Sequence, residues 1–363
     1  MVRFSIFCAG LAAAILPLGT LAAAGLTPEV VNHADGDVLF CRVALLSGTL
    51  DSDSERIVAE NLSSRESNRV VAGEAFRGRF KILVPLEPGP NRIALATESQ
   101  RTLITLFYRP KTEPLLRVIY FQARDEKTPS AEERAAYVGR LATAALLLQS
   151  AVAEKSDLFD EPGQTFAVES DAQTQVRVHF VRGAKSSAEY CRMTQNGLFD
   201  EIYREIAVQM PFDGARQLVL LSFSRYNDAL RRHEGFAATG GGNLALIGVA
   251  SFEYWPETLA DVYPALTDTT GLENARFESA GRDTVAGAVS ATLGFALHEL
   301  GHTFGLPDRP GDLAPKLDVM NQGFVHFGRI FLVKEPAWSG AKINNALMEI
   351  TPLCEPFLRR DPE

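Results

Sequence analysis

Short runs of apolar residues, separated by turn-forming stretches, dominate the chain from residue 25 to about residue 110. Turn-forming residues such as Asp35-Gly36, Ser47-Gly48 and the run EPGPN at 87–91 separate these segments. Short strands at this spacing are typical of a β-sandwich. The two prolines within residues 109–114 indicate a linker, so we predict an all-β sandwich domain over residues 25–112. Its strand-like segments are residues 37–46, 76–86, 92–96 and 102–108.

After the linker, strand-like and helix-like segments alternate. A helix is predicted to begin at Ser130, because Glu133 occupies the capping-box position three residues later. Leu198, Ile202 and Ile206 share one face of a second predicted helix. Strands that alternate with helices indicate an α/β layer, so the predicted fold of residues 113–363 is mixed, α+β or α/β. The predicted strands are residues 115–123, 175–181, 218–223 and 244–249.

A glycine run, TGGGN at residues 239–243, lies between two of these strands. It predicts a flexible turn. Because glycine has no Cβ, the same run could instead let the backbone approach a ligand closely.

A third helix is predicted over residues 285–297, which are rich in Ala, Val and Leu and contain no proline. It leads directly into His298, Glu299 and His302, which form the pattern H-E-x-x-H. Residues i and i+4 share one side of a helix, so both imidazoles can bind a single zinc ion. Glu299 lies about 100° around the helix from His298, where it can act as general base without binding the metal.

A catalytic zinc ion normally has three protein ligands and a water molecule. Gly305 offers a place for the helix to stop, and Asp308 follows it. Together they complete H-E-x-x-H-x-x-G-x-x-D, the metzincin arrangement with Asp in place of the third His. Asp308 is therefore the predicted third ligand, with Asp312 or Asp318 as alternatives. Met320 lies where a Met-turn should pass beneath the metal, although a core methionine would give the same pattern.

The N-terminus has the pattern of a signal peptide over residues 1–24. Arg3 precedes an apolar run over residues 4–21, and Ala22-Ala23-Ala24 offers a cleavage site near Ala24. An uncleaved anchor is the alternative, because the run is close to the ~20 residues that span a bilayer. We expect no later stretch to cross a membrane. Export predicts a secreted or periplasmic protein.

Charge and cysteine content exclude two other kinds of site. The net charge of −9 and the pI of about 5.3 argue against nucleic-acid binding, which needs a concentrated basic surface. Signal cleavage would remove Cys8 and leave Cys41, Cys191 and Cys354 with their pairing open. No cysteine belongs to a C-x-x-C pair, which disfavours a cysteine-based zinc site. Among the other histidines, His33 and His233 are expected in surface loops.

Beyond these motifs, the chain resembles a zinc metallopeptidase family of metzincin type found in fungi, animals and bacteria. Residues 33–37, 45–48, 78–81 and 86–91 are similar to the family's N-terminal β module. Residues 240–248 with Trp255-Pro256 resemble the segment upstream of its active site, and residues 298–305 and 319–324 resemble the active-site region. The resemblance implies a metzincin-like catalytic domain over residues 113–363, one catalytic zinc ion and a protein or peptide substrate.

One position departs from the family. Its members usually carry His where this chain has Asp308, and the added negative charge should make the zinc less electrophilic. By family analogy alone, the β module is expected to bind substrate or an envelope component.

The predicted function is that of a zinc-dependent metalloendopeptidase. Two alternatives remain. One is an exported binding protein that retains the zinc-site scaffold with little or no turnover, although the intact Glu299 speaks against it. The other is a zinc amidase that acts on cell-wall material.

Overall fold

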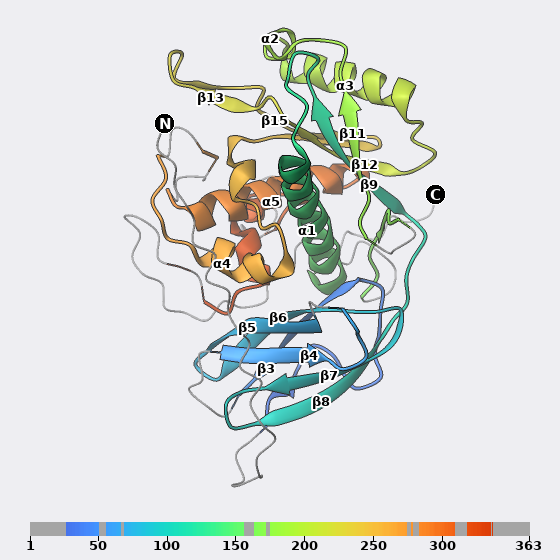
Figure 1. Cartoon of the computed structure of the whole chain (residues 1–363), viewed down its shortest axis with the longest axis vertical. Coiled ribbons are helices and arrows are strands. Elements are labelled where there is room, and N and C mark those ends of the chain that lie inside the picture. Colours follow the sequence, from blue (N-terminus) through green and yellow to red (C-terminus); the bar gives the residue numbers. More distant parts are fainter. Residues whose placement is uncertain are drawn as a thin grey trace.

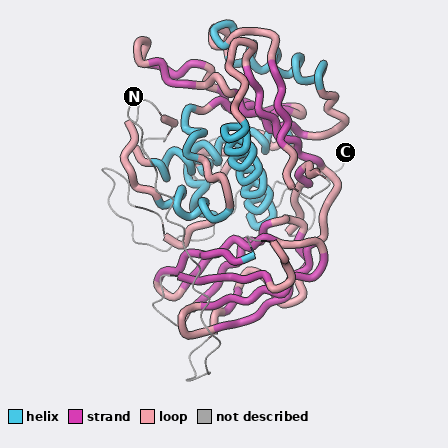
Figure 2. The backbone as a smooth tube through the Cα atoms, in the orientation of Figure 1, coloured by secondary structure: helices cyan, strands magenta, loops and turns pink. Residues whose placement is uncertain are grey.

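The computed structural model describes residues 27–50, 56–66, 69–155, 163–171, 175–273, 277–278, 283–308, 318–334 and 336. The predicted signal peptide, Asp312 and Cys354 lie outside these residues. Two β-sheets lie at opposite ends of the described structure, and most of the helical residues lie between them (Figures 1 and 2).

The N-terminal sheet has eight strands in the order β1-β3-β6-β5-β4-β7-β8-β2. It curls around an apolar core to which Ile57, Ile82 and Ile93 contribute. The predicted all-β character of this region is confirmed, and its strands form one continuous hydrogen-bonded path. We call residues 29–108 the β module. Its strands are β1 (Glu29–Val30), β2 (Val38–Leu39), β3 (Val43–Thr49), β4 (Arg56–Asn61), β5 (Val70–Phe76), β6 (Arg79–Pro85), β7 (Gly89–Ala96) and β8 (Arg101–Tyr108).

Four predictions within the β module were wrong. The segment 37–46 is not one strand, because residues 40–42 separate β2 from β3, and Ser47-Gly48 is not a turn but part of β3. The segment 76–86 is not one strand, because Arg77 and Gly78 both adopt positive φ (49° and 72°) and turn the chain between β5 and β6. The segment 87–91 is not wholly a turn, because β7 already begins at Gly89.

The second sheet has the order β10-β9-β12-β16-β15, and β11 also pairs with β9. All pairs in it are parallel except β15 with β16, so the predicted α/β layer is present. The glycine run predicted as a flexible turn largely forms β15, the antiparallel edge strand. The strands are β9 (Leu115–Gln122), β10 (Ala167–Val168), β11 (Val178–Arg182), β12 (Arg216–Leu221), β15 (Ala237–Gly241) and β16 (Leu244–Gly248), and β13 (Arg225–Asn227) pairs with β14 (Arg232–Glu234) in a separate hairpin.

Helix α1 (Ala131–Lys155) begins at the predicted capping box. The backbone N–H of Ser130 donates to Glu133 Oε2 (2.7 Å), and the N–H of Glu133 donates to Ser130 Oγ (3.2 Å). Among the described residues, α1 is the one helix long and apolar enough to cross a membrane, contrary to expectation. Its apolar character has another explanation here, since Leu141 and Leu148 are buried between the two sheets.

The other helices cover the second sheet or lie beside it. The predicted helix with Leu198, Ile202 and Ile206 is present as α3 and buries all three side chains. The helical elements after α1 are α2 (Ser187–Tyr190), α3 (Gln195–Gln209), η2 (Ala250–Tyr254), η3 (Leu259–Asp261), α4 (Val262–Thr267), α5 (Val285–Thr303) and η4 (Gly323–Ile330).

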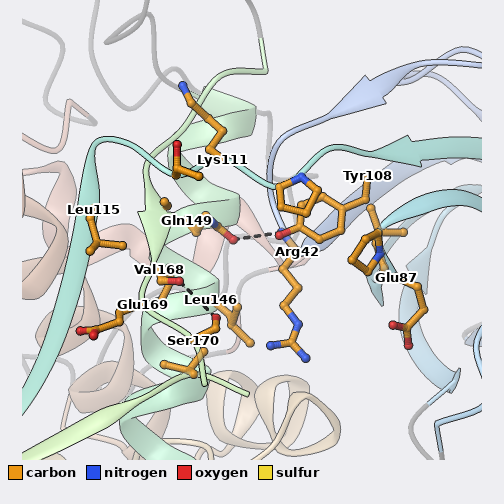
Figure 3. Close-up of a pocket in the computed structure, with 16 residues that line it drawn as sticks. Arg42, Glu87, Tyr108, Lys111, Leu115, Leu146, Gln149, Val168, Glu169 and Ser170 are labelled. Carbon is orange, nitrogen blue, oxygen red and sulfur yellow. Dashed lines mark hydrogen bonds between the residues drawn. The ribbon is translucent and has the colours of Figure 1, made fainter. Parts of the chain in front are cut away.

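Strand β3 joins the two parts of the molecule. One of its faces contributes Ala44 and Leu46 to the core of the β module, and the other packs Val43 and Leu45 into the core around α1. Next to this contact, the backbone N–H of Arg42 donates to Gln149 Oε1 of α1 (2.9 Å; Figure 3). The division predicted at residue 112 stays a prediction, but the two parts share a continuous apolar contact.

His33 was wrongly expected in a surface loop. Its side chain is only 9% exposed, and its Nε2 lies 2.7 Å from Glu154 Oε1 of α1. His233 lies in β14 and is half-buried rather than in a loop. Cys41 and Cys191 are both free thiols in the described structure, so neither pairs with the other.

Candidate active site

Helix α5 carries the H-E-x-x-H pattern and ends where the sequence predicts. Thr284 caps its start, because its hydroxyl accepts the N–H of Gly287 (3.1 Å). At the other end Gly305 adopts φ 83°, its N–H donates to His302 O (3.0 Å), and the N–H of Leu306 donates to Gly301 O (3.1 Å). This pair of bonds is a Schellman motif, which reverses the chain immediately after His302.

The two histidines face each other across one turn of α5. His298 Nε2 and His302 Nε2 lie 3.1 Å apart. Each ring places Nδ1 2.8 Å from a carbonyl oxygen, that of Val319 for His298 and that of Leu306 for His302. A carbonyl can only accept, so Nδ1 carries the proton in each ring and both Nε2 lone pairs point at the same space. Burial also lowers the pKa of His298, which favours the neutral imidazole that binds metal.

The Schellman turn brings Asp308 to these histidines. Its Oδ1 lies 3.1 Å from His298 Nε2 and 3.4 Å from His302 Nε2. In a tetrahedral site with zinc–ligand bonds of ~2.0–2.1 Å, ligand atoms lie about 3.3 Å apart. The three separations found here fit that spacing, and a cation placed between the three atoms would be bound by all of them. The residues present therefore fit a zinc ion, while the roles of these ligands stay predictions.

The two alternatives to Asp308 fare differently. Asp318 is buried, and its Oδ1 accepts the N–H of Met320 (2.9 Å) inside a turn. Asp312 lies outside the described residues.

Glu299 lies beside the two histidines, with a carboxylate oxygen within 4.8 Å of a ring nitrogen of each. Its Oε2 lies 4.0 Å from His302 Nε2, and the side chain is only 9% exposed. Burial and, to a smaller extent, the negative charge of Asp308 together raise the pKa of Glu299 to about 7. The backbone N–H of Gly240 donates to the carboxylate and acts in the opposite direction. Such a carboxyl group can both accept and release a proton near neutral pH.

Gly240 explains part of the glycine run. A Cβ atom on this residue would lie 2.0 Å from the carbonyl oxygen of Glu299. Only glycine lets β15 approach α5 this closely, so the close backbone approach is to the helix that carries the site. As an alternative to a turn, the sequence predicted a close approach to a ligand, whereas this approach is to the backbone of α5.

Met320 is fully buried under the end of α5. A Cβ on Gly301, the residue before His302, would lie 2.6 Å from Met320 Sδ. The preceding residue, Val319, supplies the carbonyl that orients His298. We call residues 318–320 the Met320 turn. Sequence reasoning found Met320 but missed the backbone carbonyls of Val319 and Leu306, since no side-chain pattern marks them.

Aromatic residues near the site divide into two groups. The ring of Phe324 lies 5.4 Å from that of His298 and 5.0 Å from that of Phe295, a neighbourhood the sequence did not single out. Trp255 is buried, and its Nε1 donates to Thr292 Oγ1 of α5 (2.8 Å). Tyr254 packs edge-on against Phe277.

Comparison with known proteins places the chain in a family. The family described as "Putative peptidase family" matches residues 27–352. A "Putative zinc metalloproteinase" of Schizosaccharomyces pombe, C607.06c, is 28% identical over 117 residues, which is 31% of this chain and 18% of that protein. Its counterpart in Saccharomyces cerevisiae, YIL108W, is 32% identical over 107 residues, 28% of this chain and 14% of that protein. The chain thus matches less than a fifth of the length of either relative.

Among solved structures, wild-type OgpA from Akkermansia muciniphila aligns with a TM-score of 0.41 and 19% identity, covering 60% of this chain and 56% of that one. An inactive form of OgpA, crystallised with an O-glycopeptide substrate, aligns with the same TM-score and 16% identity. The family match spans most of the chain and includes the H-E-x-x-H helix. The chain therefore belongs to this peptidase family, whose yeast relatives are named as zinc metalloproteinases.

Proposed function

We propose that this chain is a zinc-dependent endopeptidase of metzincin type. His298, His302 and Asp308 would hold one zinc ion, and Glu299 would act as general base. The observation that carries the proposal is the convergence of three proton-free donor atoms at zinc-ligand spacing, 3.1–3.4 Å apart, next to a buried carboxyl group.

The chemistry divides between the metal and Glu299. When bound, zinc supplies a Lewis acid that acidifies a water molecule and polarises a peptide carbonyl. Glu299 takes the proton from the attacking water and returns it to the leaving amine. The Gly240 N–H fixes one side of this carboxylate, so the base keeps its direction during both transfers. The Val319 and Leu306 carbonyls keep each imidazole in the tautomer that leaves Nε2 free.

The substrate we propose is an extended peptide segment. In the described structure β15 pairs with no strand other than β16, although Gln195 Nε2 donates to Ala238 O (2.9 Å), so a further strand could be added along its other edge. That edge includes the Gly240 N–H that reaches Glu299. A peptide laid along β15 would therefore place its backbone beside the general base.

Export and the role of the β module remain proposals of the sequence. We propose that residues 1–24 are a signal peptide and that the mature protein is secreted or periplasmic, on the N-terminal pattern alone. Binding of substrate or of an envelope component by the β module rests on family analogy.

The test is zinc content and casein hydrolysis by the mature protein, compared with Glu299→Gln. The exposed Glu132 lies in the first turn of α1, and Glu132→Gln serves as a matched control for loss of one carboxylate. We expect one zinc ion in all three proteins and a loss of cleavage of about 10²–10⁴-fold in Glu299→Gln only.

Two other outcomes would contradict the proposal. Stoichiometric zinc with hydrolysis of cell-wall amides but not of casein would support the amidase alternative. Absence of zinc after metal-replete purification would refute the metal site itself.

A further inference from the structure

The β module reaches the segment that follows the active site through two charged residues, the buried Lys81 and the partly buried Glu74. Lys81 of β6 is 2% exposed, and Glu74 of β5 lies directly opposite it in the sheet. Lysine is almost never buried unless it is paired. Here the ammonium group donates to two backbone carbonyls outside the β module, those of Arg329 (2.7 Å) and Ile330 (2.9 Å).

Glu74 holds the same segment from the complementary side. Its Oε2 accepts the backbone N–H of Val333 (2.9 Å). The ammonium group of Lys81 thus bonds two carbonyl oxygens, and the carboxylate of Glu74 bonds one amide N–H, all within residues 329–333. A third bond braces the strand itself, because the hydroxyl of Tyr263 in α4 donates to the carbonyl oxygen of Lys81 (3.0 Å).

The stretch held by this pair continues directly from η4, which lies against α5 backbone to backbone. A Cβ on Gly294 of α5 would overlap the carbonyl group of Phe324. Ser290 Oγ donates to Val325 O (3.1 Å) and accepts the N–H of Gly328 (3.0 Å). Because no flexible side chain separates η4 from α5, a displacement of η4 must be passed to its neighbours.

The other end of η4 leads back to the Met320 turn. The N–H of Gly323 donates to Asp318 O (2.8 Å), so the first residue of η4 is tied to the start of the turn. The Met320 turn orients His298 through the carbonyl oxygen of Val319, and its Met320 side chain packs against Gly301 of α5. One continuous segment, residues 318–334, therefore runs from the zinc-ligand histidine to the charge pair of the β module.

We infer that Lys81 and Glu74 form a clamp that positions the Met320 turn, and through it His298. The β module would then help to position a metal ligand, in addition to packing against the rest of the molecule. Both residues are positioning residues, since neither touches the ligand atoms. The inference rests on the proposed zinc site.

The chemistry of the contact favours this reading over simple packing. An apolar pair could bury the same area without the cost of desolvating two charges. A charged pair that bonds backbone groups of a segment fixes the position and direction of that segment whatever side chains it carries. Such an arrangement is useful where the position of a backbone carbonyl, here that of Val319, decides the geometry of a metal ligand.

The first experiment compares Lys81→Met with Arg79→Met, which removes a positive charge from the exposed start of the same strand. Zinc release from the full-length protein is followed with a chromogenic chelator, and the cobalt-substituted forms are compared by visible absorption. We expect Lys81→Met to release zinc about tenfold faster and to alter the cobalt spectrum, with Arg79→Met like the wild type. A folded Lys81→Met protein with wild-type release and spectrum would overturn the inference.

The second experiment needs no variant and covers the case in which Lys81→Met fails to fold. Coupling between two sites is reciprocal, so zinc must stabilise the clamp if the clamp positions the zinc ligand. Hydrogen exchange of the wild-type protein should slow on zinc binding in residues 329–334 and in β5 and β6, as well as in α5. Protection confined to α5 and the Met320 turn would overturn the inference.

Failure of the clamp and failure of the proposed function give different results. Both experiments read zinc binding and not peptide cleavage. A wild-type protein that binds no zinc refutes the proposed function, whereas zinc binding without protection of the clamp refutes only the clamp.

Discussion

Replacement of Gly240 by alanine tests the close approach of the β15 backbone to α5. The added Cβ would lie 2.0 Å from the carbonyl oxygen of Glu299, and ordinary contact begins at 3.4 Å. Strand β15 and helix α5 must therefore separate locally by about 1.4 Å. Gly241, the next residue, has nothing within 4 Å of its Cβ position, so Gly241→Ala is a matched control on the same strand.

The cost can be worked out from this displacement. Forcing extra atoms into a packed site costs ~1–3 kcal/mol, and the stiffer unfolded chain of an alanine variant returns ~0.4–1 kcal/mol. We therefore expect Gly240→Ala to lose about 1–2 kcal/mol of unfolding free energy. Gly241→Ala meets no neighbouring atom and should show only the gain of ~0.4–1 kcal/mol from the stiffer unfolded chain. The shift also breaks the bond from the Gly240 N–H to the Glu299 carboxylate. A displacement of ~1 Å at a catalytic group can lower activity by about 100-fold.

The assays are urea denaturation of both variants and kcat/KM on a fluorogenic peptide, with zinc content measured in parallel. If Gly240→Ala matched Gly241→Ala in both stability and activity, the claim that β15 positions the general base would be refuted. A loss of stability with full activity would show that the strand packs against α5 but does not orient Glu299.

Three further predictions concern other parts of the molecule. For His33, burial lowers the pKa, but the hydrogen bond and charge of Glu154 outweigh it and raise the pKa above its usual value. This pair therefore stabilises the fold fully below about pH 6.5, and the gain is lost as the pH rises through the raised pKa. His33→Gln should flatten this fall in unfolding free energy above about pH 6.5 in urea titrations. Thr292→Val removes the acceptor of the buried Trp255 indole and should cost ~1–3 kcal/mol in the same assay, with zinc content unchanged; an unchanged stability would show that the indole finds another partner. Asp308→Ala should lower zinc affinity by at least about tenfold in chelator competition, whereas Asp308→His should retain it; wild-type affinity in the alanine variant would move the third ligand elsewhere.

The parts of the site that were predictable from sequence are those fixed by helical geometry. His298, Glu299 and His302 follow from one helix, and the stop at Gly305 follows from its freedom to adopt positive φ. Asp308 could be named from spacing, because the turn after Gly305 is short.

The parts that escaped prediction depend on contacts between distant segments. The glycine run forms a strand because Gly240 must pass close to Glu299, 59 residues later in the chain, and nothing local distinguishes that strand from a turn. His33 was assigned to the surface because its partner, Glu154, lies 121 residues away. The contacts of Lys81 also could not be predicted, because its partners lie about 250 residues later in the chain and a lysine in a strand is normally expected to be solvent-exposed.

The packing of strand β3 limits how the β module could be exchanged between proteins by recombination. Its two apolar faces belong to two different cores, Ala44 and Leu46 to one and Val43 and Leu45 to the other. A recombination event that moved the β module alone would leave an uncovered apolar stripe on α1, and a module that arrived alone would carry an uncovered stripe of its own. We therefore expect the exchangeable genetic unit to be the β module together with α1. A lineage that lost one would have to lose or rebuild the other.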